Sequence, residues 1–354
     1  MKLFQCQNCG QPVYFENVAC ERCGARLGFR TEDMQMYALV QDAGSHWRPA
    51  AGPSEALRFC ANAGHGACNW LVPAGSASDF CIACAPNRTI PDLSDELNLQ
   101  HWRKLEASKR HLFYSLLRLG LPLNDEAAAP GTELAFELIG DTDPDTPVLT
   151  GHADGLITIN LAEADDAERE ARRTAMGEPY RTLLGHFRHE IGHYYWDRLV
   201  RDGGRLESCR AMFGDERRDY QQALADNYEK GPPDDWRERF VSSYASAHPW
   251  EDFAETWAHY LHIIDTLETA EAFGLRTRPN IPNGETLGHT VTFDPYDDVP
   301  FDKIITAWLP LTVAVNSLNR SMGQPDLYPF VLPPPTIGKL EYIHRLVHGA
   351  TPAD

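Results

Sequence analysis

Basic residues and long apolar segments are both scarce in this chain of 354 residues. Only 32 residues are Lys or Arg against 51 Asp and Glu, which gives a formal net charge of −19. A surface of that sign does not attract phosphate backbones or anionic membranes, so we expect neither nucleic acid nor a membrane as a partner. The longest apolar stretch, near 308–315, is far too short to cross a bilayer, and the first residues contain no apolar run of signal-peptide length. We therefore expect a cytoplasmic protein.

Cysteine is almost absent after residue 84, where Cys209 stands alone, and the other eight cysteines precede that point. Because cytoplasmic thiols stay reduced, cysteines paired at short spacing indicate metal sites rather than disulfides. The cysteine-rich composition ends near residue 90. This change predicts a domain boundary, with a zinc-ribbon region over 1–90 and a second domain over 91–354.

Two groups of four cysteines have spacings that fit structural zinc. The first group consists of two Cys-x2-Cys pairs separated by ten residues: Cys6, Cys9, Cys20 and Cys23. The second group has one such pair and one pair with seven residues between its members: Cys60, Cys68, Cys81 and Cys84. His65 is an alternative ligand in place of Cys60 or Cys68. We expect one or two structural zinc ions, which would supply most of the folding free energy of so short a region.

Apolar residues recur at helical spacing in several parts of the chain after residue 90. The spacing predicts helices over 93–119, 182–200, 250–267 and 301–320, with a last helix from about Thr336. Alternating apolar and polar residues at 134–139 and 156–161 predict two short strands. The acidic run 163–170 fits a solvated helix face. Together these elements predict an α+β domain that is mostly helical and has a small sheet.

The segment His189-Glu190-Ile191-Gly192-His193 lies within the helix expected over 182–200. Residues four apart project from the same helical face, so the two imidazoles can bind one zinc ion at about 2.0–2.1 Å each. Glu190 lies between them and can take a proton from a water molecule that the zinc has acidified, then pass it to a leaving amine. This pattern predicts a zinc-dependent hydrolase with Glu190 as its general base.

Two histidines leave the zinc ion one protein ligand short. Metzincins have Gly and His three and six residues after the second histidine, but Trp196 and Leu199 stand there, which excludes that class. The helix expected over 250–267 instead offers Glu251 and Glu255 one turn apart, and Glu251 follows the second histidine by 58 residues (251 minus 193). One carboxylate would bind the metal and the other would orient a ligand histidine, as in gluzincins.

The same segments carry a resemblance to gluzincin peptidases of the lethal-factor type. The helix with its two histidines is followed by Ser243-Tyr244 and then by Glu251-Asp252-Phe253-Ala254-Glu255. In that family the first glutamate of ExFAE is the ligand, which implies that Glu251 binds the metal and Glu255 orients a histidine. The resemblance also places a tyrosine seven residues before the ligand, where Tyr244 stands (251 minus 244). Its hydroxyl would stabilise the oxyanion of the tetrahedral intermediate.

Over almost its full length the chain also resembles the bacterial zinc-binding metallopeptidases that have an N-terminal zinc-ribbon region. The resemblance includes Gly-His-Ala-Asp-Gly at 151–155 and Tyr-Arg-Thr-Leu-Leu-Gly-His-Phe-Arg-His-Glu at 180–190. It implies a zincin-like fold after the ribbon, one catalytic zinc ion and a protein or peptide substrate. In zincins an edge strand pairs with the substrate backbone, and the strand expected at 155–161, which His152 precedes, would have that place.

Two other functions are open at this point. Zinc ribbons commonly recognise macromolecules, so the chain could be an adaptor that binds a protein partner through its ribbon region and uses a zincin domain only as a non-proteolytic scaffold. The intact Glu190 argues against this alternative, because a scaffold does not need a general base. The same zinc chemistry also permits hydrolysis of a non-peptide amide.

Overall fold

The computed structural model describes residues 1–42, 44, 46–123, 132–141, 148–175, 178, 180–282 and 284–349. The chain packs as two compact units. One comprises Met1–Leu117, Glu133–Gly151 and Leu156–Arg169, and the other comprises Arg118–Thr132, His152–Gly155 and Glu170–Asp354. The domain boundary expected near residue 90 stays a prediction, because a division into compact units does not test which segments fold independently.

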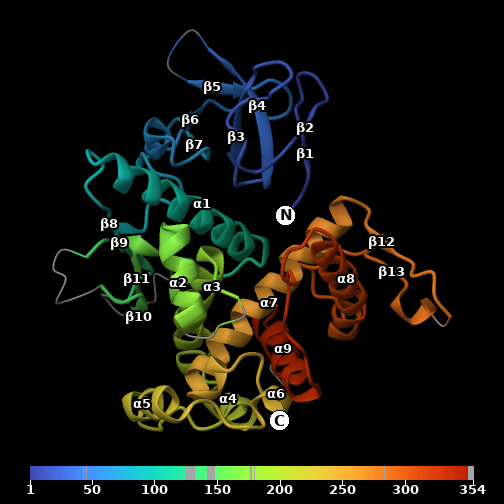
Figure 1. Ribbon diagram of the computed structural model, residues 1–354. Helices are drawn as coiled ribbons and strands as arrows, with labels where there is room; N and C mark the ends of the chain where they lie inside the picture. The colour runs from blue at the N-terminus through green and yellow to red at the C-terminus, as the bar shows by residue number, and fades with distance from the viewer. Residues whose placement is uncertain are drawn as a thin grey trace. The chain divides into compact units, whose positions relative to one another are not determined.

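The cysteine-rich part of the first unit is built from short antiparallel strands (Figure 1). A two-stranded sheet pairs β1 (Phe4–Gln5) with β2 (Pro12–Val13). A five-stranded sheet follows in chain order: β3 (Arg26–Arg30), β4 (Gln35–Gln41), β5 (Trp47–Pro49), β6 (Leu57–Phe59) and β7 (Leu71–Pro73). Aromatic rings form its core, where the centroid of Phe29 lies 4.8 Å from that of Phe15 and 5.1 Å from that of Trp70. This five-stranded sheet was not predicted from the sequence.

The first unit also contains most of α1 (Glu96–Arg118), which confirms the helix predicted over 93–119. Both predicted strands are present in a sheet of order β10-β11-β9-β8. The bounds of these strands are β8 (Asn87–Thr89), β9 (Ala135–Ile139), β10 (Gly151–Ala153) and β11 (Leu156–Asn160). β9 and β11 are parallel, with Ala135 opposite Leu156. The expectation that the strand at 155–161 forms an edge is wrong, because β10 flanks β11 on its other side.

The second unit contains two helices that lie side by side, α3 (Leu183–Tyr195) and α7 (Pro249–Ala272) (Figure 1). α3 begins after Thr182, whose hydroxyl accepts a hydrogen bond from the backbone N–H of Gly185 at 3.0 Å. Beyond Tyr195 the chain continues as a π-helical segment, Trp196–Arg201. The helices predicted over 182–200 and 250–267 are therefore confirmed, with a change of helical geometry in the first of them after Tyr195.

Gly192 lets α3 and α7 pack closely. A Cβ atom added at Gly192 would lie 3.1 Å from Cα and 3.3 Å from the carbonyl oxygen of Ala254, and 3.2 Å from Cβ of Trp257. These separations are shorter than ordinary van der Waals contact, and two of the three atoms belong to backbone, which cannot easily move away. One turn further along α3, the ring of Tyr195 stacks on that of Trp257 with centroids 5.0 Å apart. The close packing brings together the helix faces that carry the predicted metal ligands.

The remaining elements of the chain are mostly helical. The acidic run lies in α2 (Asp166–Ala175) and the short 3₁₀ turn Leu161–Ala164 that precedes it. The predicted C-terminal helices are confirmed as α8 (Phe301–Ser321) and α9 (Pro334–Val347). The sequence did not predict α4 (Leu206–Phe213), α5 (Tyr220–Lys230), α6 (Trp236–Arg239), the 3₁₀ turns Tyr244–Ser246 and Gly284–Leu287, or the strand pair β12 (Arg276–Thr277) and β13 (His289–Thr290). Among the helices of the described residues, none combines the length and the apolar character needed to cross a membrane.

Candidate metal centre

The packing of α3 against α7 brings three of the predicted ligands to one point. The Nε2 atoms of His189 and His193 lie 3.2 Å apart. Oε2 of Glu251, in the first turn of α7, lies 3.0 Å from the first of these nitrogens and 3.6 Å from the second. The three side chains therefore form a group that could hold one metal ion.

The spacing of these three atoms fits zinc. Four ligands placed tetrahedrally at about 2.0–2.1 Å from a zinc ion lie about 3.3 Å from one another, and the observed separations bracket that value. Oε2 of Glu251 is buried and has no hydrogen-bond partner within the described part of the chain. A buried carboxylate oxygen without a donor is costly, and a bound cation would compensate it. The donor set of two imidazoles and one carboxylate leaves the fourth position of the metal free.

Glu255 fixes the orientation of one ligand. Nδ1 of His189 donates a hydrogen bond to Oε1 of Glu255 at 2.7 Å, which leaves the lone pair of Nε2 directed toward Glu251. The other oxygen of Glu255 accepts a hydrogen bond from the hydroxyl of Ser242 at 2.5 Å. Burial alone would raise the pKa of Glu255, but its hydrogen bond to His189 lowers this pKa to about 2. The carboxylate therefore stays ionised and can accept both hydrogen bonds.

These contacts predict different effects for the two glutamates. Glu251→Ala removes an atom of the candidate centre, whereas Glu255→Ala leaves all three ligand atoms and only frees the ring of His189. We expect the zinc affinity of Glu255→Ala to fall about 10- to 100-fold, so that this variant keeps part of its zinc at moderate chelator concentrations. At the same concentrations, Glu251→Ala should lose the zinc of this centre. Zinc content by atomic absorption after dialysis against graded chelator measures this. A larger loss in Glu255→Ala would show that the roles are reversed.

The two residues predicted to act in catalysis lie close to the same centre. Glu190 is only 8% exposed, and its burial raises the pKa of its carboxyl group. It is near enough to His189 and Glu251 to interact with their charges. Tyr244 is half-buried, and its ring centroid lies 6.0 Å from that of His189. The structure thus brings Glu190 and Tyr244 into the surroundings of the three ligands.

Sequence reasoning did not find two other residues at this centre. The hydroxyl of Tyr220 donates a hydrogen bond to Oε1 of Glu251 at 2.6 Å. The ring of Trp250 lies against that of His193, with centroids 3.7 Å apart. Tyr220 precedes Glu251 by 31 residues, a separation that fits no known ligand spacing. Trp250 is an aromatic residue in the first turn of a helix, where such a residue usually indicates packing. His152 lies farther out, with its ring centroid 6.2 Å from that of His193.

Each predicted cysteine group is brought together as well. In the first group the sulfur atoms of Cys6 and Cys23 lie 3.7 Å apart, and those of Cys9 and Cys20 lie 3.6 Å apart. In the second group, all of whose members are buried, the sulfur atoms of Cys68 and Cys81 lie 3.8 Å apart. A tetrahedral zinc site with Zn–S bonds of about 2.3 Å separates its sulfur atoms by about 3.8 Å. The second group contains both Cys60 and Cys68, and the alternative ligand His65 is not among its members.

Comparison with known proteins gives matches to both parts of the chain. Residues 98–346 match the family described as "putative zinc-binding metallo-peptidase", and residues 3–95 match a zinc-ribbon domain. One protein of Mycobacterium tuberculosis and one of Mycobacterium bovis, each named as an uncharacterized protein, are 42% identical to this chain over 353 residues. These alignments cover 99% of this chain and 97% of each relative. No solved structure matches the chain.

Proposed function

Because the chain belongs to the family described as "putative zinc-binding metallo-peptidase" and carries an N-terminal zinc-ribbon domain, we propose that it hydrolyses peptide bonds at the centre formed by His189, His193 and Glu251. One observation carries this proposal. Three ligand atoms converge at tetrahedral zinc spacing, and a buried carboxyl group, that of Glu190, lies on the same helix as two of them. That combination is the one a hydrolytic zinc site needs.

The proposal includes a zincin-like fold of gluzincin type for the catalytic part, similar to the lethal-factor type. It assigns one catalytic zinc ion to this centre and one structural zinc ion to each cysteine group. The substrate is a protein or peptide, and we place the enzyme in the cytoplasm. The ribbon region is the surface through which a protein partner would bind.

In the reaction, Glu190 is the general base and Tyr244 the oxyanion donor. His189, His193 and Glu251 would hold the zinc ion, which would polarise the substrate carbonyl and lower the pKa of water. Glu190 takes one proton from the attacking water as the water oxygen bonds to the carbonyl carbon, and the carbonyl electron pair moves onto its oxygen. Tyr244 donates a hydrogen bond to that oxygen. As the C–N bond breaks, Glu190 returns the proton to the leaving nitrogen, so that one carboxylic acid and one amine are formed.

Cleavage-site profiling tests the proposed activity directly. The zinc-loaded full-length protein is incubated with a proteome-derived peptide library, and new termini are identified by mass spectrometry. We expect cleavage at sites with a shared residue preference, loss of this cleavage after chelation, and its return when zinc is added back to a sample of known metal content. If the zinc-loaded protein produces no new termini, the adaptor alternative or hydrolysis of a non-peptide amide replaces this proposal.

A further inference from the structure

Tyr220 is the first residue of α5, and it contacts the candidate centre from outside α3 and α7. The preceding residue, Asp219, caps α5 by accepting a hydrogen bond from the backbone N–H of Gln222 at 2.9 Å. From this fixed helix end the hydroxyl of Tyr220 reaches Oε1 of Glu251 at 2.6 Å. The centre therefore draws on three helices rather than the two that carry the ligands.

The hydrogen bond from Tyr220 makes the two oxygens of Glu251 unequal. Oε1 accepts a hydrogen bond from the Tyr220 hydroxyl. Oε2 has no donor in the described residues and faces Nε2 of His189 and His193. A hydrogen bond to Oε1 draws electron density from that oxygen, which favours metal binding through Oε2 alone. Two-oxygen binding would fill the fourth position of the metal, which a hydrolytic zinc site keeps for water or substrate.

The ring of Tyr220 is held in place independently of its hydroxyl. It packs edge-on against His248 and Trp250, with ring centroids 5.2 Å and 5.6 Å away. His248 in turn joins the start of α7 to the chain just before α5. Its Nδ1 accepts from the backbone N–H of Trp250 at 3.1 Å, so the proton lies on Nε2, which donates to the carbonyl of Arg218 at 3.2 Å. Loss of the hydroxyl alone should therefore leave the ring where it is.

From this arrangement we infer that Tyr220 is a positioning residue that keeps Glu251 bound to zinc through one oxygen. The effect of Tyr220 on catalysis rests on the proposed function. The role toward Glu251 does not, because it concerns metal binding alone.

Tyr220→Phe tests the inference, because it removes the hydroxyl and keeps the ring. In the full-length protein we expect the zinc affinity of this centre to fall about tenfold or more, as measured by competition with a chromogenic chelator. Cobalt substituted at the centre should give weaker visible absorption, since coordination by both oxygens of Glu251 turns a four-coordinate site into a five-coordinate one. With a peptide found by cleavage profiling, kcat should fall about 10- to 100-fold while KM stays within about twofold.

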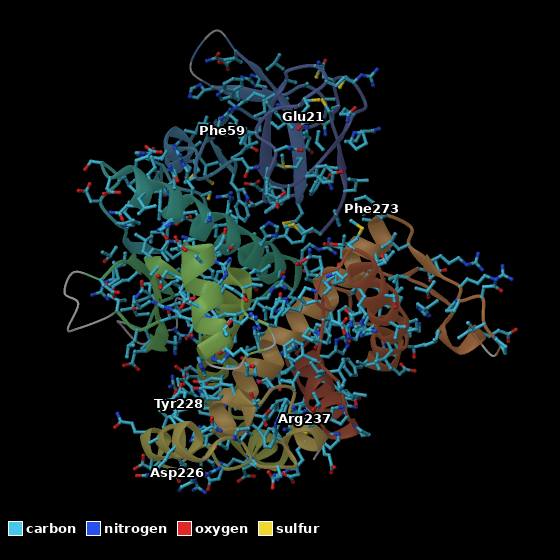
Figure 2. The ribbon with its side chains drawn as sticks, in the orientation of Figure 1. Glu21, Phe59, Asp226, Tyr228, Arg237 and Phe273 are labelled. Atoms are coloured by element: carbon cyan, nitrogen blue, oxygen red, sulfur yellow. The ribbon has the colours of Figure 1, made fainter. Side chains whose placement is uncertain are left out.

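Tyr228→Phe is the matched control. Tyr228 lies on the same helix but is 67% exposed, and it is labelled in Figure 2. We expect the zinc affinity, cobalt spectrum and kinetics of Tyr228→Phe to equal those of the wild type. Circular dichroism melting of both variants shows whether the fold is intact.

The metal and kinetic measurements separate this inference from the proposed function. If Tyr220→Phe keeps wild-type zinc affinity, cobalt spectrum and kcat, the inference is wrong even where the wild type cleaves peptides. If the wild type cleaves nothing but Tyr220→Phe weakens zinc binding and changes the cobalt spectrum, the proposed function fails while the role of Tyr220 toward Glu251 holds.

Discussion

Replacement of Glu190 by Gln is expected to lower kcat/KM for peptide hydrolysis by roughly 10²- to 10⁴-fold and to leave the zinc content unchanged. Gln has nearly the same shape as Glu, so the side chain can keep its buried place on α3. It cannot accept a proton from water, and it introduces no charge into a buried site. The loss should therefore appear in kcat, since Glu190 contributes no atom to the candidate metal group.

Steady-state kinetics and metal analysis on the same preparation measure this effect. Glu207→Gln is the matched control, because Glu207 is an exposed carboxylate in the first turn of α4. We expect it to have wild-type activity. A Glu190→Gln protein with its zinc in place and full activity would refute the assignment of Glu190 as general base.

Replacement of Lys339 by Met is expected to lower the free energy of unfolding by about 3–5 kcal/mol. Nζ of Lys339, on α9, donates hydrogen bonds to Oδ2 of Asp252 at 2.6 Å and to the carbonyl of Arg239 at 2.9 Å. Asp252 is fully buried and Lys339 nearly so. Met fills a similar volume but removes the charge that holds down the pKa of Asp252, which burial raises to about 7 even beside Lys339. The buried carboxyl group must then either stay ionised without its partner or take up a proton, and this cost sets the size of the effect.

Urea denaturation followed by tryptophan fluorescence measures the change. Asp252→Asn combined with Lys339→Met removes both charges, and we expect the double variant to recover most of the lost stability. Lys303→Met, on the exposed side of α8, should alter the free energy of unfolding by no more than about 0.5 kcal/mol. Equal stability of Lys339→Met and the wild type would mean that this ion pair does not stabilise the fold.

Hydrophobic periodicity was sufficient to predict the long helices. α1, α3, α7, α8 and α9 all contain buried apolar residues at helical spacing, and each begins within a few residues of its predicted start. The three candidate ligands could also be predicted, because the spacing of two histidines on one helix and a glutamate on the next is a local property of sequence. The structure adds the distances between their ligand atoms.

The features that sequence reasoning did not predict depend on contacts between distant segments. Tyr220 reaches Glu251 from the start of α5, which His248 joins to the start of α7, and no residue spacing encodes that contact. The strands β1 and β2 are two residues long, which is too short for an alternating pattern. β11 was wrongly expected to be an edge strand because the three residues of β10, which flanks it, have no recognisable strand pattern.

The close packing at Gly192 limits which sequences can build this centre. His-Glu-x-x-His is usually written with two unspecified positions, but here the second position faces the backbone of Ala254 at a distance that a larger residue does not permit. A helix with the same histidines and a bulky residue at that position would carry the ligands without bringing Glu251 to them. A search for proteins with this type of site should therefore require His-Glu-x-Gly-His together with a small residue three positions after the ligand glutamate, where Ala254 follows Glu251 in this chain.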